Sequence, residues 1–130
     1  MTSSAALTIV VPGDDPPQLQ GSSAVDRLRQ LGDLTLYTDR PATFEEKISR
    51  VKDADVIVNT RSLVTWRREE FAELPKLKLI AVCSIGVDNI DLDAASEHGV
   101  VVSNQPGKIE PFVAEHTVGL MFAVAKRAAF

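Results

Sequence analysis

Short β-branched apolar runs alternate with longer amphipathic stretches from one end of the chain to the other. Five runs predict strands, at residues 6–11, 34–37, 56–58, 77–82 and 100–102. Five stretches with helical spacing predict helices, at residues 24–31, 43–52, 66–74, 91–98 and 111–127. Strands that alternate with helices favour a parallel sheet, because each crossover between parallel strands needs a helix-length connection.

The chain is therefore predicted to be an α/β protein with a flavodoxin-like, doubly wound, five-stranded parallel sheet of order 2-1-3-4-5, in three layers. The runs 8–11, 56–58 and 100–102 are apolar enough to be buried on both faces. We expect residues 1–110 to form this domain and residues 111–130 to form a separate helix. Ligands of such sheets bind beyond the carboxyl ends of the strands, so the turns after residues 11, 58, 82 and 102 are the candidate sites.

Several residues mark where the predicted helices begin and end. Thr43 and Glu46 have the spacing of a capping box. Asp91 is placed to cap the helix 91–98, and Gly99 to end it in the left-handed conformation. Gly32 is expected to close the helix 24–31 in the same way.

The composition excludes several classes of function. The chain has 130 residues, a net charge of -4 and a pI near 5.1, so neither nucleic acid nor a membrane surface is expected as a partner. No apolar run approaches the roughly 18 residues of a transmembrane helix, and no signal peptide is evident. The single cysteine, Cys83, fits a reducing compartment and is expected to pack as a small hydrophobe. The sequence thus predicts a cytoplasmic protein without a metal site.

The turn after the fourth predicted strand is the most informative segment. Residues 83–91 read Cys-Ser-Ile-Gly-Val-Asp-Asn-Ile-Asp, so a strand end passes through Gly86 into an acidic helix start. Such a turn exposes successive backbone N–H groups, which suit a carboxylate or another small anion. Gly86 lets a ligand approach without a Cβ in the way. From these residues alone, an ordinary tight turn stays open beside the anion site.

Three ordered motifs within residues 79–117 resemble those of D-isomer-specific 2-hydroxyacid dehydrogenases, a family that includes phosphoglycerate and glyoxylate/hydroxypyruvate reductases. The first is the glycine turn itself, close to the family's G-x-G-x-D-N-[IV]-D. The second is Gly-Val-Val-Val-Ser-Asn-Gln-Pro-Gly at 99–107, and the third is Val-Ala-Glu-His-Thr at 113–117. The resemblance covers nearly the whole chain and implies the N-terminal, substrate-binding (catalytic) domain of such an enzyme.

The resemblance implies roles for particular residues. The backbone amides of Ile85, Gly86 and Val87 would hold the substrate carboxylate, with Ser84 at the edge. Many relatives carry an assisting arginine after the third strand. Here Asn59 occupies that position and Arg61 follows two residues later, so both are candidate substrate-binding residues, although Arg61 also fits a solvated surface position.

Two further positions are implied to lie near the cofactor, and the cofactor's own domain is expected to be absent. Asn104 and Thr117 match positions that face the nicotinamide. The cofactor would be NAD or NADP, and the catalytic side chains would belong to a nucleotide-binding domain that opens with G-x-G-x-x-G. No such motif occurs in this sequence. We therefore expect no catalytic residue within the chain and no turnover by the chain alone; the alternative is a stand-alone flavodoxin-like binding or dimerisation module.

The last predicted helix is apolar around most of its circumference, which predicts burial on several sides. We therefore expect a homodimer, which a domain swap through residues 111–127 could form. A small 2-hydroxy or 2-oxo acid is the expected ligand, bound weakly by this chain alone.

Two other proteins of the same fold class fit less well. A receiver-type signalling module needs a phosphate-accepting Asp after the third strand, where Asn59 and Thr60 stand, and a Lys after the fifth, where Asn104 stands. A flavodoxin-type electron carrier needs a hydroxyl-rich phosphate loop after the first strand, but residues 12–17 are acidic and rich in proline.

Overall fold

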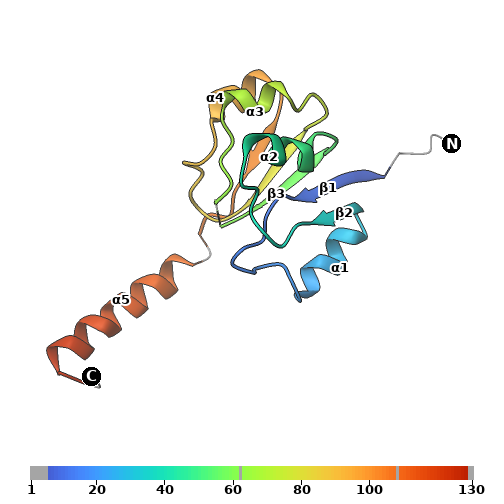
Figure 1. The fold of residues 1–130 in the computed structure, drawn as a ribbon. Helices are drawn as coiled ribbons and strands as arrows, with labels where there is room; N and C mark the ends of the chain where they lie inside the picture. The colour runs from blue at the N-terminus through green and yellow to red at the C-terminus, as the bar shows by residue number, and fades with distance from the viewer. Residues whose placement is uncertain (1–5, 62, 108, 129–130) are drawn as a thin grey trace.

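The computed structural model describes residues 6–61, 63–107 and 109–128. Within these residues, five strands alternate with five helices (Figure 1). The strands are β1 (Leu7–Val11), β2 (Gly32–Leu36), β3 (Val56–Thr60), β4 (Leu79–Cys83) and β5 (Val101–Ser103). The helices are α1 (Ser23–Arg29), α2 (Phe44–Val51), α3 (Arg68–Ala72), α4 (Leu92–Glu97) and α5 (Glu110–Ala125).

All strand pairs are parallel, and the sheet order is β2-β1-β3-β4-β5. This confirms the predicted doubly wound α/β fold. The main core lies on one face of the sheet, where Ile57 and Ile80 pack with Val51 of α2, Phe71 of α3 and Ala94 of α4. The five predicted strands and five predicted helices are present in the described residues, with bounds that shift by at most two residues.

The other face of the sheet is covered only in part. A small cluster there joins Ile9, Val11 and Val58 with Leu28 of α1. Beyond α1, the side chains of Ala81 and Cys83 are half-buried and that of Val101 is 62% exposed. We call Val58, Ala81, Cys83 and Val101 the open sheet face.

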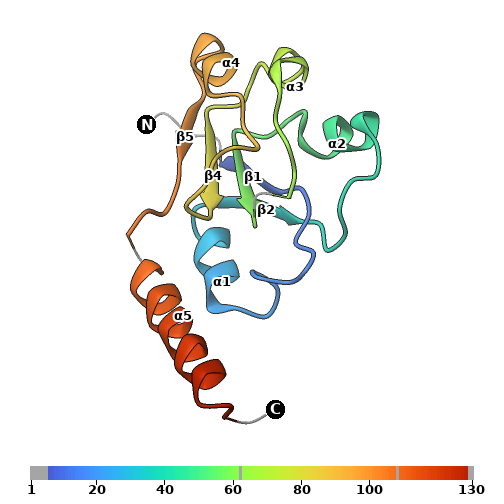
Figure 2. The ribbon, with the colours of Figure 1, turned by 90° about the vertical axis from the view of Figure 1, so that its left-hand side faces the viewer.

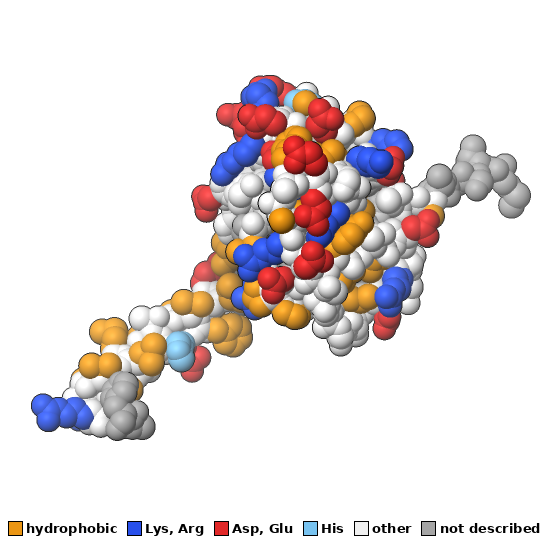
Figure 3. All heavy atoms as spheres, in the orientation of Figure 1, with side chains coloured by type: hydrophobic (Ala, Val, Ile, Leu, Met, Phe, Trp, Pro, Cys, Tyr) orange, Lys and Arg blue, Asp and Glu red, His pale blue; other side chains and the backbone are white. Residues whose placement is uncertain are grey.

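The prediction that the run 100–102 is buried on both sides is therefore wrong for Val101. Its physical reason is the course of α5, which leaves the body of the domain instead of packing beside α1 (Figures 1 and 2). Seven large apolar side chains of α5 are about half to two thirds exposed: Phe112, Val113, Val118, Leu120, Met121, Phe122 and Val124. Figure 3 shows hydrophobic side chains distributed along this helix.

The predicted helix boundaries are confirmed where a cap defines them. The Asp91 carboxylate accepts the Ala94 N–H at 2.9 Å, and Gly99 has a φ of +70°. Thr43 Oγ1 accepts the Glu46 N–H at 3.1 Å, while the Glu46 carboxylate accepts the N–H of Ala42, one residue before the cap.

Gly32 does not close α1, so that prediction is wrong. Helix α1 ends at Arg29, and Gly32 is the first residue of β2, paired with Leu7. A Cβ at Gly32 would lie 2.1 Å from the carbonyl oxygen of Leu7. The glycine is therefore required by the close approach of two strands rather than by the end of a helix.

Asp14 closes the loop between β1 and α1 and is fully buried. Its carboxylate accepts the backbone N–H groups of Gln18 at 3.0 Å and of Leu19 and Gln20 at 2.9 Å. Burial opposes ionisation of Asp14, but the hydrogen bonds from Gln20, Gln18 and Leu19 outweigh it, so the pKa of Asp14 lies below its usual 3.8. The acidic loop thus serves the fold.

Replacing Asp14 with asparagine is expected to lower the free energy of unfolding at pH 7 by about 2–3 kcal/mol, because an amide nitrogen cannot accept these N–H groups. The folded-state pKa is depressed, so the stabilisation is complete above pH 3.8 and is lost as the pH falls through the folded-state value. Urea unfolding at pH 7 and at pH 3 should show a smaller acid-induced loss for D14N than for the wild type. Equal losses would contradict this role.

Candidate functional site

The loops after β3, β4 and β5 meet at the carboxyl edge of the sheet. Thr60 pairs with Cys83 in the parallel register, so residues 61 and 84 leave neighbouring strands at the same level. The loop after β5 is tied to the loop after β4, because the Gln105 N–H donates to the Ser84 carbonyl at 3.0 Å. The loops after β3, β4 and β5 therefore lie next to one another at the carboxyl edge of the sheet.

The glycine turn, residues 84–87, has its carbonyls engaged within the protein. The Ile85 carbonyl accepts the Asn104 side-chain amide at 2.7 Å, and the Gly86 carbonyl accepts the Ser84 hydroxyl at 3.0 Å. The amides of Ile85 and Val87 donate to no acceptor in the described part of the chain. Backbone N–H groups such as those of Ile85 and Val87, in a turn whose carbonyls are bonded within the protein, are suited to an anion.

Gly86 is exposed, and its backbone is not left-handed. A Cβ at this position would lie 3.2 Å from Oδ2 of Asp88. The fold itself therefore does not demand glycine here as strictly as it does at Gly32. What glycine provides is open access to the backbone amides.

The two residues predicted after β3 differ in their surroundings. Asn59 is fully buried, and its side-chain amide donates to the Val64 carbonyl at 3.2 Å. Arg61 is exposed and has a φ of +50°, a left-handed conformation that is uncommon for arginine. Arg61 thus lies on the same edge as the glycine turn, while Asn59 lies beneath it.

The two residues predicted near a cofactor are not brought together. Asn104 belongs to the loop enclosing the glycine turn, and its side chain supports the Ile85 carbonyl. Thr117 lies on α5, where its hydroxyl donates to the Val113 carbonyl at 2.8 Å. Helix α5, which carries Thr117, stands away from the sheet (Figure 2). Their roles toward a cofactor stay predictions.

Cys83 lies at the end of β4, immediately before the turn. Burial raises the pKa of the Cys83 thiol, and the charge of Asp14 raises it further. A thiol that is harder to ionise is a poorer nucleophile. Its contacts with the small cluster around Val58 fit the predicted packing role.

Asn89 was not among the predicted site residues, yet its side chain is buried and donates to the same Val64 carbonyl as Asn59, at 2.7 Å. At the level of sequence, Asn89 is a candidate for capping and orienting the following helix, with ligand contact as the alternative. The contact joins positions 25 residues apart, so no local spacing signals it.

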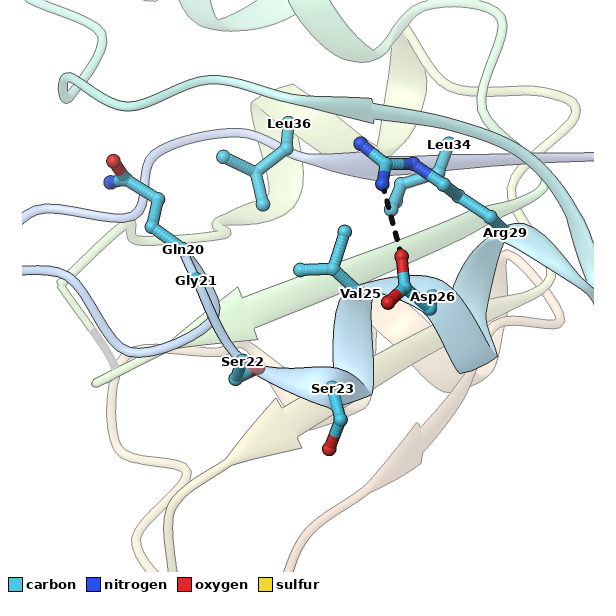
Figure 4. A pocket seen from close by; sticks show the side chains of 9 residues that line it. All are labelled: Gln20, Gly21, Ser22, Ser23, Val25, Asp26, Arg29, Leu34 and Leu36. Atoms are coloured by element: carbon cyan, nitrogen blue, oxygen red, sulfur yellow. Dashed lines mark hydrogen bonds and ion pairs between the residues drawn. The ribbon is translucent and has the colours of Figure 1, made fainter.

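A separate hollow of about 650 Å³ lies between α1 and β2 (Figure 4). Val25, Leu34 and Leu36 line it, and Arg29 pairs with Asp26 at 3.3 Å beside it. Strand β2 is an edge strand, separated from β4 by β1 and β3. This hollow is therefore distinct from the glycine turn.

Within the described residues, no group of three or more His, Cys, Asp or Glu side chains could hold a metal ion. In the same part of the chain, no helix combines the length and apolar character needed to cross a bilayer.

The fold and the turn define a doubly wound α/β domain with an anion-suited loop at its carboxyl edge. The family model for the D-isomer specific 2-hydroxyacid dehydrogenase catalytic domain matches residues 17–129. The chain therefore belongs to this family.

Relatives and solved structures of this kind match most of the chain. A D-3-phosphoglycerate dehydrogenase of Methanocaldococcus jannaschii is 41% identical over 103 residues, which are 79% of this chain and 19% of that protein. An acyclic imino acid reductase solved with NADPH and D-Arg superposes with a TM-score of 0.79 at 25% identity, covering 91% of this chain and 37% of that one. The NAD+-bound 3-phosphoglycerate dehydrogenase of Entamoeba histolytica gives 0.72 at 29% identity, covering 92% and 39%.

The chain thus spans about a fifth of the length of the Methanocaldococcus relative and less than two fifths of either solved structure.

Proposed function

We propose that this chain is the substrate-binding side of an NAD(P)-dependent D-2-hydroxyacid dehydrogenase. The amides of Ile85, Gly86 and Val87 hold the substrate carboxylate, Ser84 borders it, and Arg61 contributes positive charge from the neighbouring loop. The observation that carries the proposal is the glycine turn, whose carbonyls are bonded within the protein while the Ile85 and Val87 amides have no acceptor in the described residues. Family membership supports it.

Hydride transfer in this proposal needs a nicotinamide cofactor that the chain does not bind by itself. The sequence contains no G-x-G-x-x-G turn for a pyrophosphate, so its residues do not fit the cofactor. The proposed division of labour leaves the carboxylate to this chain and the cofactor to a nucleotide-binding domain. Two solved structures of similar fold carry NAD+ and NADPH respectively, so the proposal covers either cofactor.

A titration of the 15N-labelled chain with glycolate, the smallest 2-hydroxy acid, tests the carboxylate site. We expect amide shifts at residues 84–87 and 61, with a weak dissociation constant on the order of 1 mM. Glycolamide has the same size without the charge and should leave these signals unmoved. Equal shifts with both compounds, or none with either, would contradict the proposal. Binding of NADH to the chain alone would contradict the division of labour.

We also propose that the chain forms a homodimer in which α5 of each copy packs on the open sheet face of the other. Both surfaces are apolar, and a hollow of about 540 Å³ bounded by Leu28, Leu31, Ala81 and Cys83 lies on that face.

We also propose that the protein is located in the cytoplasm. The single cysteine favours a reducing compartment, and cell fractionation tests this location.

Light scattering at micromolar concentration is expected to give a dimer of about 28 kDa, twice the 14.1 kDa of one chain. Replacing Leu120 and Phe122 with glutamate should yield the monomer, because charged side chains on α5 cannot be buried against an apolar face. Lys76→Glu, at an exposed position in the loop between α3 and β4, alters the net charge by the same amount as the double variant and serves as the control. A wild-type mass of one chain would refute the dimer.

A further inference from the structure

One carbonyl group, that of Val64, receives two buried side-chain donors. Asn59 at the end of β3 donates its amide at 3.2 Å, and Asn89 beyond the glycine turn donates at 2.7 Å. The exposed fractions of the two asparagines are 0% and 8%. We call this arrangement the Val64 clamp. It joins the loop after β3 to the loop after β4.

A backbone bridge reinforces the same junction. The Trp66 N–H donates to the Asn89 carbonyl and the Asp91 N–H to the Trp66 carbonyl, both at 2.8 Å. Trp66 is fully buried in the main core. The far end of the loop after β3 is therefore fixed to the segment that follows the glycine turn.

The near end of the loop is fixed as well. Thr60 is buried, and its hydroxyl donates to the Gly13 carbonyl at 3.0 Å. Arg61 follows in the left-handed conformation. Arg61 therefore directly follows a residue whose side chain is anchored to the loop after β1.

We propose that Asn59 and Asn89 are positioning residues, which hold the Arg61 loop in register with the glycine turn through the Val64 carbonyl. The inference rests on the proposed carboxylate site and identifies how its two halves are kept together. Asn59 acts from below the site, without touching the substrate. A carboxamide suits this task, because it donates to a buried carbonyl without adding a charge next to the anion.

The shared acceptor makes a distinctive prediction. Removal of one asparagine leaves the Val64 carbonyl with its other donor, whereas removal of both leaves a buried carbonyl without a hydrogen bond. The side-chain oxygens of both asparagines lack a partner within the described residues. Alanine at either position therefore removes only the donor side of the clamp, and the two changes should be strongly non-additive.

The experiment compares N59A, N89A and the double variant in the glycolate titration. We expect each single variant to weaken binding by less than about threefold and the double variant by more than about tenfold. Leu74→Ala is the control: it removes buried carbons from the same core but makes no hydrogen bond to the clamp, and should leave the dissociation constant unchanged. Additive effects, or an equal loss in the Leu74 variant, would overturn the proposal.

A measurement without ligand separates the clamp from the carboxylate site. Amide hydrogen exchange at Trp66 and Asp91 reports the bridge directly. In the double variant these two amides should exchange at least about tenfold faster than in either single variant, while those of Ile57 and Ile80 in the sheet stay protected. Unchanged exchange at Trp66 and Asp91 would refute the clamp even if glycolate binds. If the exchange rates change as expected but the wild type does not bind glycolate, the Val64 clamp stands and only the proposed function is refuted.

Discussion

Replacing Lys47 with methionine is expected to lower the free energy of unfolding by about 3–5 kcal/mol, the usual cost of leaving one half of a buried ion pair without its partner. Lys47 lies on α2 and pairs with Glu70 on α3, and their side chains are only 10% and 7% exposed. The ammonium group also donates to the Thr65 carbonyl at 2.9 Å and lies 5.4 Å from the centre of the Trp66 ring. One side chain thus joins two helices and the loop after β3.

The loss arises mainly from Glu70. Its carboxylate accepts the Arg67 N–H at 2.6 Å, and without Lys47 it would remain buried with a single neutral donor. A second change, Glu70→Gln, removes the unpaired charge while keeping an acceptor for Arg67. The double variant K47M/E70Q should therefore be more stable than K47M alone, which a merely additive loss of two contacts would not produce.

Urea unfolding followed by tryptophan fluorescence measures these differences, since Trp66 is the only tryptophan. The matched control is Lys76→Met. Lys76 pairs with Asp53 at 2.7 Å, but both side chains are more than 60% exposed, so solvent screens the pair and no measurable loss is expected. Equal stability of the Lys47 and Lys76 variants would contradict the assigned role of the buried pair. Should K47M fail to fold, E70Q alone still tests it.

The order of the elements and the local caps could be predicted because their signals lie close together in sequence. The apolar runs give the five strands, and the family motifs locate the turn at Gly86. Asp91 and Gly99 mark the two ends of α4 within eight positions, and the structure has both as predicted. These features could be predicted because the residues that form a cap or a strand are close together both in sequence and in space.

The remaining features depend on contacts that no local spacing encodes. Lys47 and Glu70 are 23 positions apart, and Asn89 reaches Val64 across 25. Neither pair could be recognised before the strands were paired. Gly32 was misassigned for the same reason, since the atom that excludes a side chain there belongs to Leu7 on the neighbouring strand.

The prediction that residues 100–102 are buried on both faces of the sheet failed at Val101, because α5 does not cover that face. Its apolar residues predict that the helix is buried, but they do not identify the surface that would cover it. The spacing of apolar residues predicts helix α5 correctly, but it does not determine the direction in which the chain continues after β5. Asn59 is a related case: its position in the sequence suggested a ligand contact, while its burial in the structure favours the indirect role proposed above.

Alanine at Gly86 is expected to weaken glycolate binding by at least about tenfold, while changing stability by less than about 1 kcal/mol. The added methyl group would stand on the face through which the carboxylate must approach the amides of the turn. It would also meet the Asp88 carboxylate at 3.2 Å. That side chain is exposed and free to rotate outward, and no left-handed backbone is required of Gly86.

Alanine at Gly99 should show the opposite pattern, and the two variants therefore control each other. Gly99 has a φ of +70° at the end of α4, with nothing within 4 Å of an added Cβ. The strain of a left-handed alanine is expected to cost about 1–2 kcal/mol in stability, with no effect on glycolate binding. Urea unfolding and the amide titration, run on both variants, decide between a binding turn and a structural one. If G86A destabilises the fold as G99A does and still binds glycolate normally, then Gly86 serves the chain's conformation and the carboxylate site lies elsewhere.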